Sequence, residues 1–303
     1  MRSFHHVYTA AYHGPHQPTG PARCVSPVGY FIWPHMNHAG NRVVFWGRGA
    51  TEIGFNIWLA SVDGTRLEKI THDRALTGHP SWRADGREIV FTSSLGLCDL
   101  LDWSMSMRMQ VTPQNVYVMD PDGGNRRQLT HGHFADGRPS YTPDGQSVVF
   151  VSNRSGAGTS HLFRVEIDTG KLTQITTGSL LHWRPMVSPD GKKLCYFTMT
   201  SSESVHELAI MDLASGKVEY PIDRARFIWV HGPAWTPDGK AIVMHAKSHG
   251  RNNCDLWHMD LATGELSMMQ LPGFTTAGHF TLDAAMRVMS YDSAEVPAER
   301  SAG

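Results

Sequence analysis

The sequence predicts an all-β fold, a six-bladed β-propeller made of four-stranded antiparallel blades. Three observations predict it. A short motif recurs along the 303 residues, its copies are spaced by roughly the length of one propeller blade, and an apolar hairpin follows most copies. We therefore expect residues 1–303 to form a single propeller domain.

The repeated motif reads Pro-x-aromatic-Ser/Thr-Pro-Asp-Gly, with small departures. Its four clear copies and two degenerate copies are Pro80–Gly86, Pro139–Gly145, Pro185–Gly191, Pro233–Gly239, Pro34–Gly40 and Gly278–Ala284. The Asp-Gly pair predicts a tight turn with glycine at positive φ, and the apolar run after it predicts a buried returning strand. The turns should therefore fall at positions 40, 86, 145, 191, 239 and 284.

The two ends of the chain are expected to complete one blade together. After position 284 only one further strand fits, Met286–Tyr291, so the last blade lacks its two outer strands. The segments Phe4–Tyr12 and Pro21–Val25 can form that missing hairpin. Its pairing with the last blade would close the ring without an unpaired inner strand edge. The predicted boundaries are a closing hairpin over 1–30 and blades over about 31–75, 76–133, 134–179, 180–225, 226–272 and 273–303.

Composition excludes several classes of function. The chain has 27 Lys plus Arg against 28 Asp plus Glu, a net charge of -1 and no basic cluster, so we expect no nucleic-acid partner. No apolar run approaches the roughly 20 residues that span a bilayer, and the first residues lack the apolar stretch of a signal peptide. The four cysteines form no Cys-x-x-Cys pair. We expect a cytoplasmic protein without a membrane partner.

Histidine is abundant, with 18 residues, and many of these histidines occupy equivalent places in the repeat. Residues that precede the repeated proline, and residues that open the third strand, should converge on one mouth of the central channel. They are His35, His79, His131, His133, Arg138, His161, His182, Arg184, His206, His231, His249 and His279. Imidazoles from several blades would suit a metal or a carboxylate. The alternative is that each histidine only makes hydrogen bonds within its own blade. The remaining histidines, His245 among them, are assigned to surfaces, turns or outer strands.

The repeated motif resembles the WD40-like repeat of TolB-type propellers, and the resemblance covers nearly the whole chain. It implies the propeller fold. It leaves the function open, because propellers serve as scaffolds, as binding proteins and as enzymes.

Two blades also resemble oligogalacturonate lyases. Tyr30–Phe45 with Phe55–Leu59 is similar to the first blade of that family, and Gly278–Ser293 is similar to the blade that carries a metal-ligating histidine, which would be His279. The resemblance implies β-elimination on uronic acid oligosaccharides with a divalent metal such as manganese. The Gln-x-x-His-x-His cluster that completes the family's manganese site is absent from this sequence.

Candidate roles follow from the channel-mouth residues and this resemblance together. The candidate metal ligands are His79, His182, His231 and His279. The candidate catalytic residues are His206 as the base, with Arg138 and Arg184 gripping a carboxylate bidentately. The candidate substrate-binding residues are Trp33, Trp183, Trp229, His35 and His133. The expected partner is a small acidic oligosaccharide or another small molecule.

Two other functions stay open. One is a non-catalytic, TolB-like propeller that binds a protein partner. The other is a different small-molecule enzyme, such as an isomerase or a hydrolase, although the sequence contains no Gly-x-Ser-x-Gly, His-Glu-x-x-His or Walker A motif.

Overall fold

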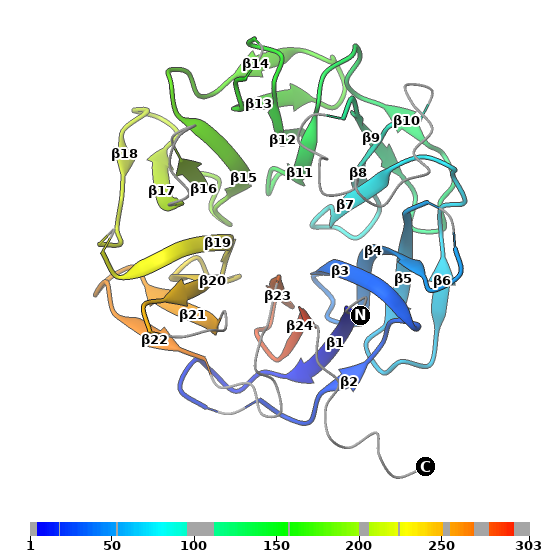
Figure 1. The fold of residues 1–303 in the computed structure, drawn as a ribbon, viewed down its shortest axis with the longest axis horizontal. Helices are drawn as coiled ribbons and strands as arrows, with labels where there is room; N and C mark the ends of the chain where they lie inside the picture. Colours follow the sequence, from blue (N-terminus) through cyan, green and yellow to red (C-terminus); the bar gives the residue numbers. More distant parts are fainter. Residues whose placement is uncertain are drawn as a thin grey trace.

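The protein is a ring of six four-stranded antiparallel sheets around a central axis (Figure 1). The structure is a computed structural model, and it describes residues 5–17, 19–52, 54–95, 112–156, 158–199, 206–223, 225–250, 255–269 and 279–293. The predicted six-bladed propeller is confirmed. Among these residues no helix is present that could cross a membrane.

Each blade runs from an innermost strand at the channel to an outermost strand at the rim. Blade 1 contains β3 (Gly29–Met36), β4 (Arg42–Gly49), β5 (Asn56–Ser61) and β6 (Leu67–Lys69). Blade 2 contains β7 (Thr77–Trp82), β8 (Ile89–Ser93), β9 (Asn115–Met119) and β10 (Arg127–Gln128). Blade 3 contains β11 (Gly137–Tyr141), β12 (Ser147–Ser152), β13 (His161–Glu166) and β14 (Leu172–Gln174).

The second half of the ring follows the same order. Blade 4 contains β15 (Leu181–Val187), β16 (Lys193–Met199), β17 (Glu207–Asp212) and β18 (Val218–Glu219). Blade 5 contains β19 (Phe227–Trp235), β20 (Ala241–Ser248), β21 (Asp255–Asp260) and β22 (Leu266–Met268). Blade 6 contains β23 (Phe280–Leu282), β24 (Val288–Ser293), β1 (His6–Ala11) and β2 (Arg23–Cys24).

Blade 6 is therefore built from both ends of the chain, as predicted. Strand β1 pairs antiparallel with β24 from His6 opposite Ser293 to Ala11 opposite Val288, and β2 adds the outer edge. This pairing closes the ring, so the last blade presents no long unpaired edge.

The turns between the first two strands of each blade have the predicted geometry in five blades. Glycines at positions 40, 86, 145, 191 and 239 have φ between 68° and 74°. In blade 6 the prediction at Ala284 is wrong, because the residue at positive φ is Met286, with φ 55°. The alignment by motif missed this shift because blade 6 has no glycine at its turn.

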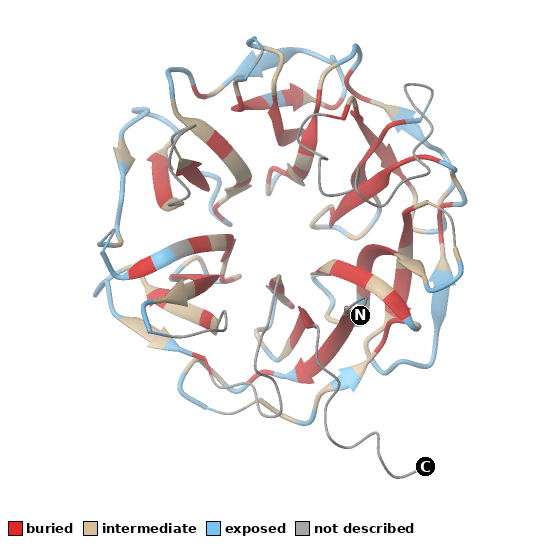
Figure 2. Cartoon of the chain, in the orientation of Figure 1, coloured by how far each residue is buried: buried red, intermediate tan, exposed pale blue. Residues whose placement is uncertain are grey.

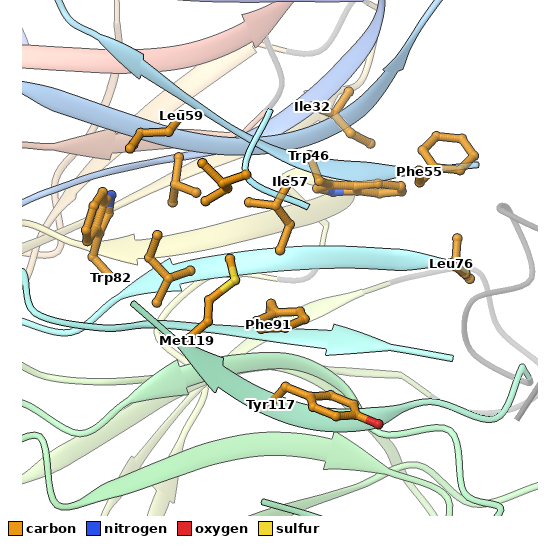
Figure 3. Packing of buried hydrophobic residues seen from close by; sticks show 13 residues of the cluster. Ile32, Trp46, Phe55, Ile57, Leu59, Leu76, Trp82, Phe91, Tyr117 and Met119 are labelled. Atoms are coloured by element: carbon orange, nitrogen blue, oxygen red, sulfur yellow. The ribbon is translucent and has the colours of Figure 1, made fainter. Parts of the chain in front are cut away.

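The hydrophobic core lies between the blades. Six apolar clusters are described, and each joins two successive sheets around the ring. Figure 3 shows the first of them, where Ile57 of blade 1 faces Phe91 and Met119 of blade 2. The outermost strands, such as β14, are exposed (Figure 2). Stability thus comes from sheet-on-sheet packing, and the inner strands hold the residues that face the axis.

Candidate functional site at the channel axis

One position on the innermost strands has an unusual backbone. In blades 1 to 5 the residue before the repeated proline has positive φ: 56° at Trp33, 54° at His79, 50° at Arg138, 54° at Arg184 and 65° at Gly232. The pairing register with the second strand shifts at each of these places, which marks a β-bulge. We call these residues, together with His279 of blade 6, the axial position.

The axial position is strained wherever it is not glycine. A bulky side chain at positive φ costs on the order of 1–3 kcal/mol, and such residues cluster at functional sites. Four of the six non-glycine residues with positive φ in the described chain occupy this position. Because the same distortion recurs in successive blades, it is a built feature of the channel.

The axial residues surround a pocket on the axis. Every blade contributes the axial residue and the two that follow it: Trp33–His35, His79–Ser81, Arg138–Ser140, Arg184–Met186, Gly232–Ala234 and His279–Thr281. Its volume is about 70 Å³, which exceeds what one water molecule needs but falls below a typical ligand pocket of about 300 Å³ or more. The pocket can enclose a group of the size of a carboxylate, and a larger ligand must extend beyond it.

Trp33 links the axial residues across the channel. Its ring stacks on the His79 ring with centroids 4.1 Å apart and meets the His279 ring edge-on at 4.8 Å. The guanidinium carbons of Arg138 and Arg184 lie 5.2 Å and 5.1 Å from the same indole, within the range of cation–π attraction. One indole from blade 1 thus contacts groups from blades 2, 3, 4 and 6.

The two arginines carry positive charge in a poorly solvated place. Burial lowers the pKa of Arg138 to about 10, and burial together with the charge of Arg138 lowers the pKa of Arg184 to about 9. Both guanidinium groups stay protonated at neutral pH, so the lowered pKa values reflect the cost of keeping these charges away from water. In the described residues no carboxylate lies within 4.0 Å of either guanidinium.

Blade 5 leaves space for the guanidinium group of Arg184, because its axial residue is Gly232, which has no side chain. A Cβ atom on Gly232 would lie 3.1 Å from Nη1 of Arg184 and 2.8 Å from Nδ1 of His245. Glycine also tolerates the positive φ without strain. Gly232 is therefore a positioning residue for Arg184.

His279 forms a dyad with Asp292. Its Nδ1 lies 2.8 Å from Oδ2 of Asp292, and the same oxygen accepts the backbone N–H of Trp33 at 2.7 Å. Burial raises the pKa of Asp292 to about 7, and burial followed by the charge of Arg184 lowers the pKa of His279 well below its usual value. Because Oδ2 already accepts one N–H, Nδ1 is best placed to carry the shared proton, which leaves the lone pair on Nε2.

Several nitrogen atoms of the pocket are buried without a partner in the described part of the chain. They are Nε1 of Trp33, Nε of Arg138, Nη1 of Arg184, Nε2 of His79 and Nε2 of His279. Buried polar groups are nearly always hydrogen-bonded, so a group of unpaired nitrogens needs an explanation. The nitrogens of Trp33, Arg138 and Arg184 are N–H donors. Asp292 cannot serve them with its Oδ2, because this oxygen already accepts hydrogen bonds from Trp33 N–H and from His279.

The structure brings some predicted residues to the pocket and places others elsewhere. Trp33, His35, His79, Arg138, Arg184 and His279 line it. His35 is already used between blades 1 and 2, where its ring nitrogens lie 3.3 Å from Ser81 Oγ and 3.3 Å from the Trp82 backbone N–H. Trp183 packs against the apolar clusters on both sides of blade 4, and Arg138 lies 5.1 Å from its ring. His133 is exposed, and the side chain of Trp229 lies outside the described residues.

The other predicted histidines lie outside this pocket. His182 is buried between blades 3 and 4, with Nδ1 3.3 Å from the Ser160 carbonyl and 3.3 Å from Nδ1 of His161. His206 and His231 form an aromatic cluster with Phe197, and the His231 ring centroid lies 6.1 Å from that of His279. The four candidate metal ligands thus do not face one common point, because His182 is turned into its own blade interface.

Two residues near the axis were missed by the sequence analysis. His245 is buried in β20 opposite His231, with ring centroids 5.0 Å from His231 and 5.3 Å from His279, so its assignment to a surface or outer strand is wrong. Asp292 lies in β24. Both residues belong to the second strand of a blade. The sequence could have indicated that they lie near the axis only through the alternation of side chains between the two faces of that strand.

A divalent metal fits this site poorly. Among the described residues no three His, Cys, Asp or Glu side chains are arranged to hold a metal ion. Arg184 and Arg138 lower the pKa values of His79, His231 and His279 by their charge, although burial has the larger effect, and the same field would repel a cation. The donor set suits an anion.

Comparisons with known proteins match the fold. The family described as "TolB beta propeller domain" matches residues 104–223. A putative tricorn protease homolog of Streptomyces coelicolor is 31% identical over 148 residues, which cover 47% of this chain and 11% of that protein. A TolB homolog of Chlorobium luteolum is 26% identical over 39% of this chain and 33% of its own length. The chain thus spans a third or less of the length of these relatives.

Solved structures extend the match to nearly the whole chain. A putative TolB from Agrobacterium tumefaciens superposes with a TM-score of 0.70 at 15% identity, over 95% of this chain and 98% of that one. An oligogalacturonate lyase in complex with manganese superposes with a TM-score of 0.55 at 16% identity, over 82% of this chain and 69% of that one. At these identities the structures share the fold. The protein is therefore a six-bladed β-propeller that is similar to the TolB propeller family over residues 104–223, and it shares its fold with TolB and with oligogalacturonate lyase.

Proposed function

We propose that the protein is a carbohydrate-active lyase that performs β-elimination on uronic acid oligosaccharides at the axial pocket. The observation that carries the proposal is the His279–Asp292 dyad beside two unpaired arginines. β-Elimination needs a base next to a bound carboxylate and positive charge where the enolate-like charge develops. The neighbouring lyase fold supports the same class of reaction.

Each residue has a defined task in this reaction. Arg138 and Arg184 bind the carboxylate of the uronate and stabilise the charge that develops on it. Nε2 of His279 removes the proton on the carbon next to the carboxylate. The electron pair forms a double bond to the neighbouring carbon and expels the glycosidic oxygen, which takes up a proton from water. Asp292 holds the imidazole in the tautomer that leaves Nε2 free.

Substrate binding would also activate the base. Without a substrate, burial and the charge of Arg184 depress the pKa of His279. A carboxylate between the arginines cancels much of their field, so the pKa of His279 rises and Nε2 becomes a stronger base. His206, the base that the sequence predicts, lies in the aromatic cluster with His231, outside the pocket lining.

The test is the formation of an unsaturated uronate. Purified protein is incubated with oligogalacturonates, with and without manganese, and the ultraviolet absorbance of the new conjugated double bond is followed. We expect His279→Gln to lower the rate by about 100-fold or more, the usual contribution of a positioned base. Arg87→Gln changes an exposed turn residue and serves as the control. No product from any uronide with the wild-type protein would refute the lyase.

A second function, a non-catalytic TolB-like propeller that binds a protein, is supported by the sequence relatives, since TolB proteins are among them. In this function a protein partner binds at the rim of the channel mouth and makes no use of the axial pocket. Its binding, measured by calorimetry with a purified Pal protein, would be unchanged in Arg184→Gln. Strong binding that is insensitive to this change, together with no product from uronides, would favour this function.

A further inference from the structure

We propose that the axial pocket is an anion site that takes one carboxylate group without a resident divalent metal, the two guanidinium groups of Arg138 and Arg184 doing what a metal ion would do. This inference rests on the proposed function for the location of the ligand. It does not rest on the elimination chemistry, and the two can fail separately.

The chemistry of the pocket favours an anion. Nε1–H of Trp33, an N–H of Arg138 and an N–H of Arg184 are buried donors without acceptors in the described chain. The three donors belong to residues of blades 1, 3 and 4, and all three residues line a single cavity. A carboxylate offers about four acceptor sites, and arginine matches it bidentately.

The size of the pocket limits what it can enclose. About 70 Å³ holds a carboxylate but not a sugar ring. The ring of a uronic acid would therefore lie at the opening of the pocket, with only its acidic group inside. The carboxylate would then lie beside Arg138 and Arg184, which both line the pocket.

The strain at the axial position argues for the same ligand. Trp33, Arg138 and Arg184 all have positive φ, and the two arginines carry like charges beside the same Trp33 ring. Neither arginine forms an ion pair with a carboxylate in the described residues, and Asp292, whose charge acts on Arg184, is already hydrogen-bonded to His279. A buried charge without a partner destabilises a fold. An anion in the pocket would pair both charges at once, so the arrangement is explained by a ligand and is otherwise costly.

Trp33 is a positioning residue in this proposal. Its indole lies within cation–π range of both guanidinium groups and is stacked on the His79 ring, so it restrains the positions of the two arginines. Its own N–H adds a third donor. Trp33→Phe keeps an aromatic ring but removes that donor. This variant therefore separates the contribution of the indole N–H from the contribution of the ring's contact with the arginines.

Calorimetric titration of the metal-free protein tests the proposal. The protein is stripped with a chelator, its metal content is checked by elemental analysis, and sodium D-galacturonate is titrated in. D-galactose is the neutral control, and sodium sulfate is the inorganic anion. We expect one galacturonate per chain, the same affinity when manganese is added back, and no binding of galactose.

The variants assign the binding to the arginines. Loss of one charged hydrogen bond should weaken galacturonate binding by about 10-fold to 100-fold in Arg138→Gln and in Arg184→Gln. Trp33→Phe should weaken it less, and the exposed Arg87→Gln should leave it unchanged. The melting temperature of each variant shows that it is folded. Competition by sulfate would indicate a general anion site, and its absence would indicate a carboxylate site; both results support the proposal.

The outcomes separate this inference from the lyase. Metal-independent galacturonate binding without any elimination product would uphold the anion site and refute the lyase. Binding that disappears on chelation and returns only with manganese would overturn the anion site, even if the protein is a lyase. Binding of unchanged strength in both arginine variants would overturn it as well.

Discussion

The interfaces between blades and the channel axis differ in packing, in backbone regularity and in the pairing of their charged groups. At the interface of blades 1 and 2, Ile57, Ile89 and Phe91 are almost fully buried against one another, with regular backbone. At the axis, strained residues such as Arg138 and Arg184 leave charged groups without partners in the described chain. The first arrangement is expected of a stable core, and the second of a binding site. The difference teaches that the ring is held by its interfaces and that its axis is built for a ligand.

The same repeat produces both regions. The turn glycines are nearly identical in five blades, with φ within a few degrees of each other. The axial position varies instead: it is Trp33, His79, Arg138, Arg184, Gly232 and His279 in turn around the ring. A repeated backbone with one variable position lets five blades present tryptophan, histidine or arginine side chains at the axis, while blade 5 leaves space there with glycine.

Acid should affect the inner strands before the apolar interfaces. Burial lowers the pKa of His35 and of His182 to about 4, and burial together with Arg184 lowers the pKa of His245 to about 3. These imidazoles stay neutral in the folded chain while the unfolded chain binds protons below pH 6.5. Stability is therefore complete above pH 6.5 and is lost as the pH falls toward 4.

The expected loss between pH 7 and pH 5 is about 2 kcal/mol for each of these histidines, or about 6 kcal/mol for the three. The pKa of Asp292, raised to about 7, acts in the opposite direction, because the folded chain binds this proton first. Urea unfolding at pH 7, 6 and 5 measures the sum. A free energy of unfolding that is constant over this range would contradict the burial of neutral imidazoles.

Most of the fold could be predicted from the sequence because its signals are local. The repeated turn motif and the apolar hairpins indicate the blades. Counting the blades leaves the last one short of two strands, and β1 and β2 supply them. The axial arginines could also be found, since they directly precede the repeated proline. Asp292 and His245 could not, because their inward direction depends on the register of β24 and β20.

The orientation of His182 shows a second limit of the sequence. It lies only two residues before Arg184, within the same strand, yet it bonds to Ser160 of blade 3. The bulge at Arg184 shifts the register between these two residues, so simple alternation no longer tells which side chain faces the axis.

Removing a side chain from an interface between blades should lower the stability of the fold without changing ligand binding at the axis. Phe150 is fully buried between blades 2 and 3. Phe150→Ala should lower the free energy of unfolding by about 3–5 kcal/mol through lost burial and a cavity. Urea unfolding measures the loss, and the affinity for galacturonate below the transition should stay as in the wild type. A loss of galacturonate affinity in Phe150→Ala would show that the blade interface and the axial pocket are not independent.

A methyl group at the axial glycine should disturb the axis from within. Gly232→Ala forces alanine to adopt a φ near 65° and places its Cβ 3.1 Å from Nη1 of Arg184. We expect a loss of about 1–2 kcal/mol in stability from the backbone and a weaker affinity for galacturonate from the displaced arginine. Gly191→Ala, at a turn glycine with similar φ and open space around it, is the matched control. It should lose stability and keep the affinity.

Removing one axial charge should have the smallest effect, and of opposite sign. Arg138→Met replaces a guanidinium that has no acidic partner in the described residues with an apolar side chain of similar length, and it relieves the repulsion that lowers the pKa of Arg184. We expect the free energy of unfolding to rise by about 1–2 kcal/mol while galacturonate binding is lost, because removal of an uncompensated buried charge stabilises a fold. Arg154→Met is the contrasting variant: Arg154 pairs with the fully buried Asp136 at 2.6 Å, so its removal should destabilise the protein. If Arg138→Met destabilises the fold as Arg154→Met does, the axis contributes to stability like the rest of the ring, and its strain cannot be attributed to ligand binding.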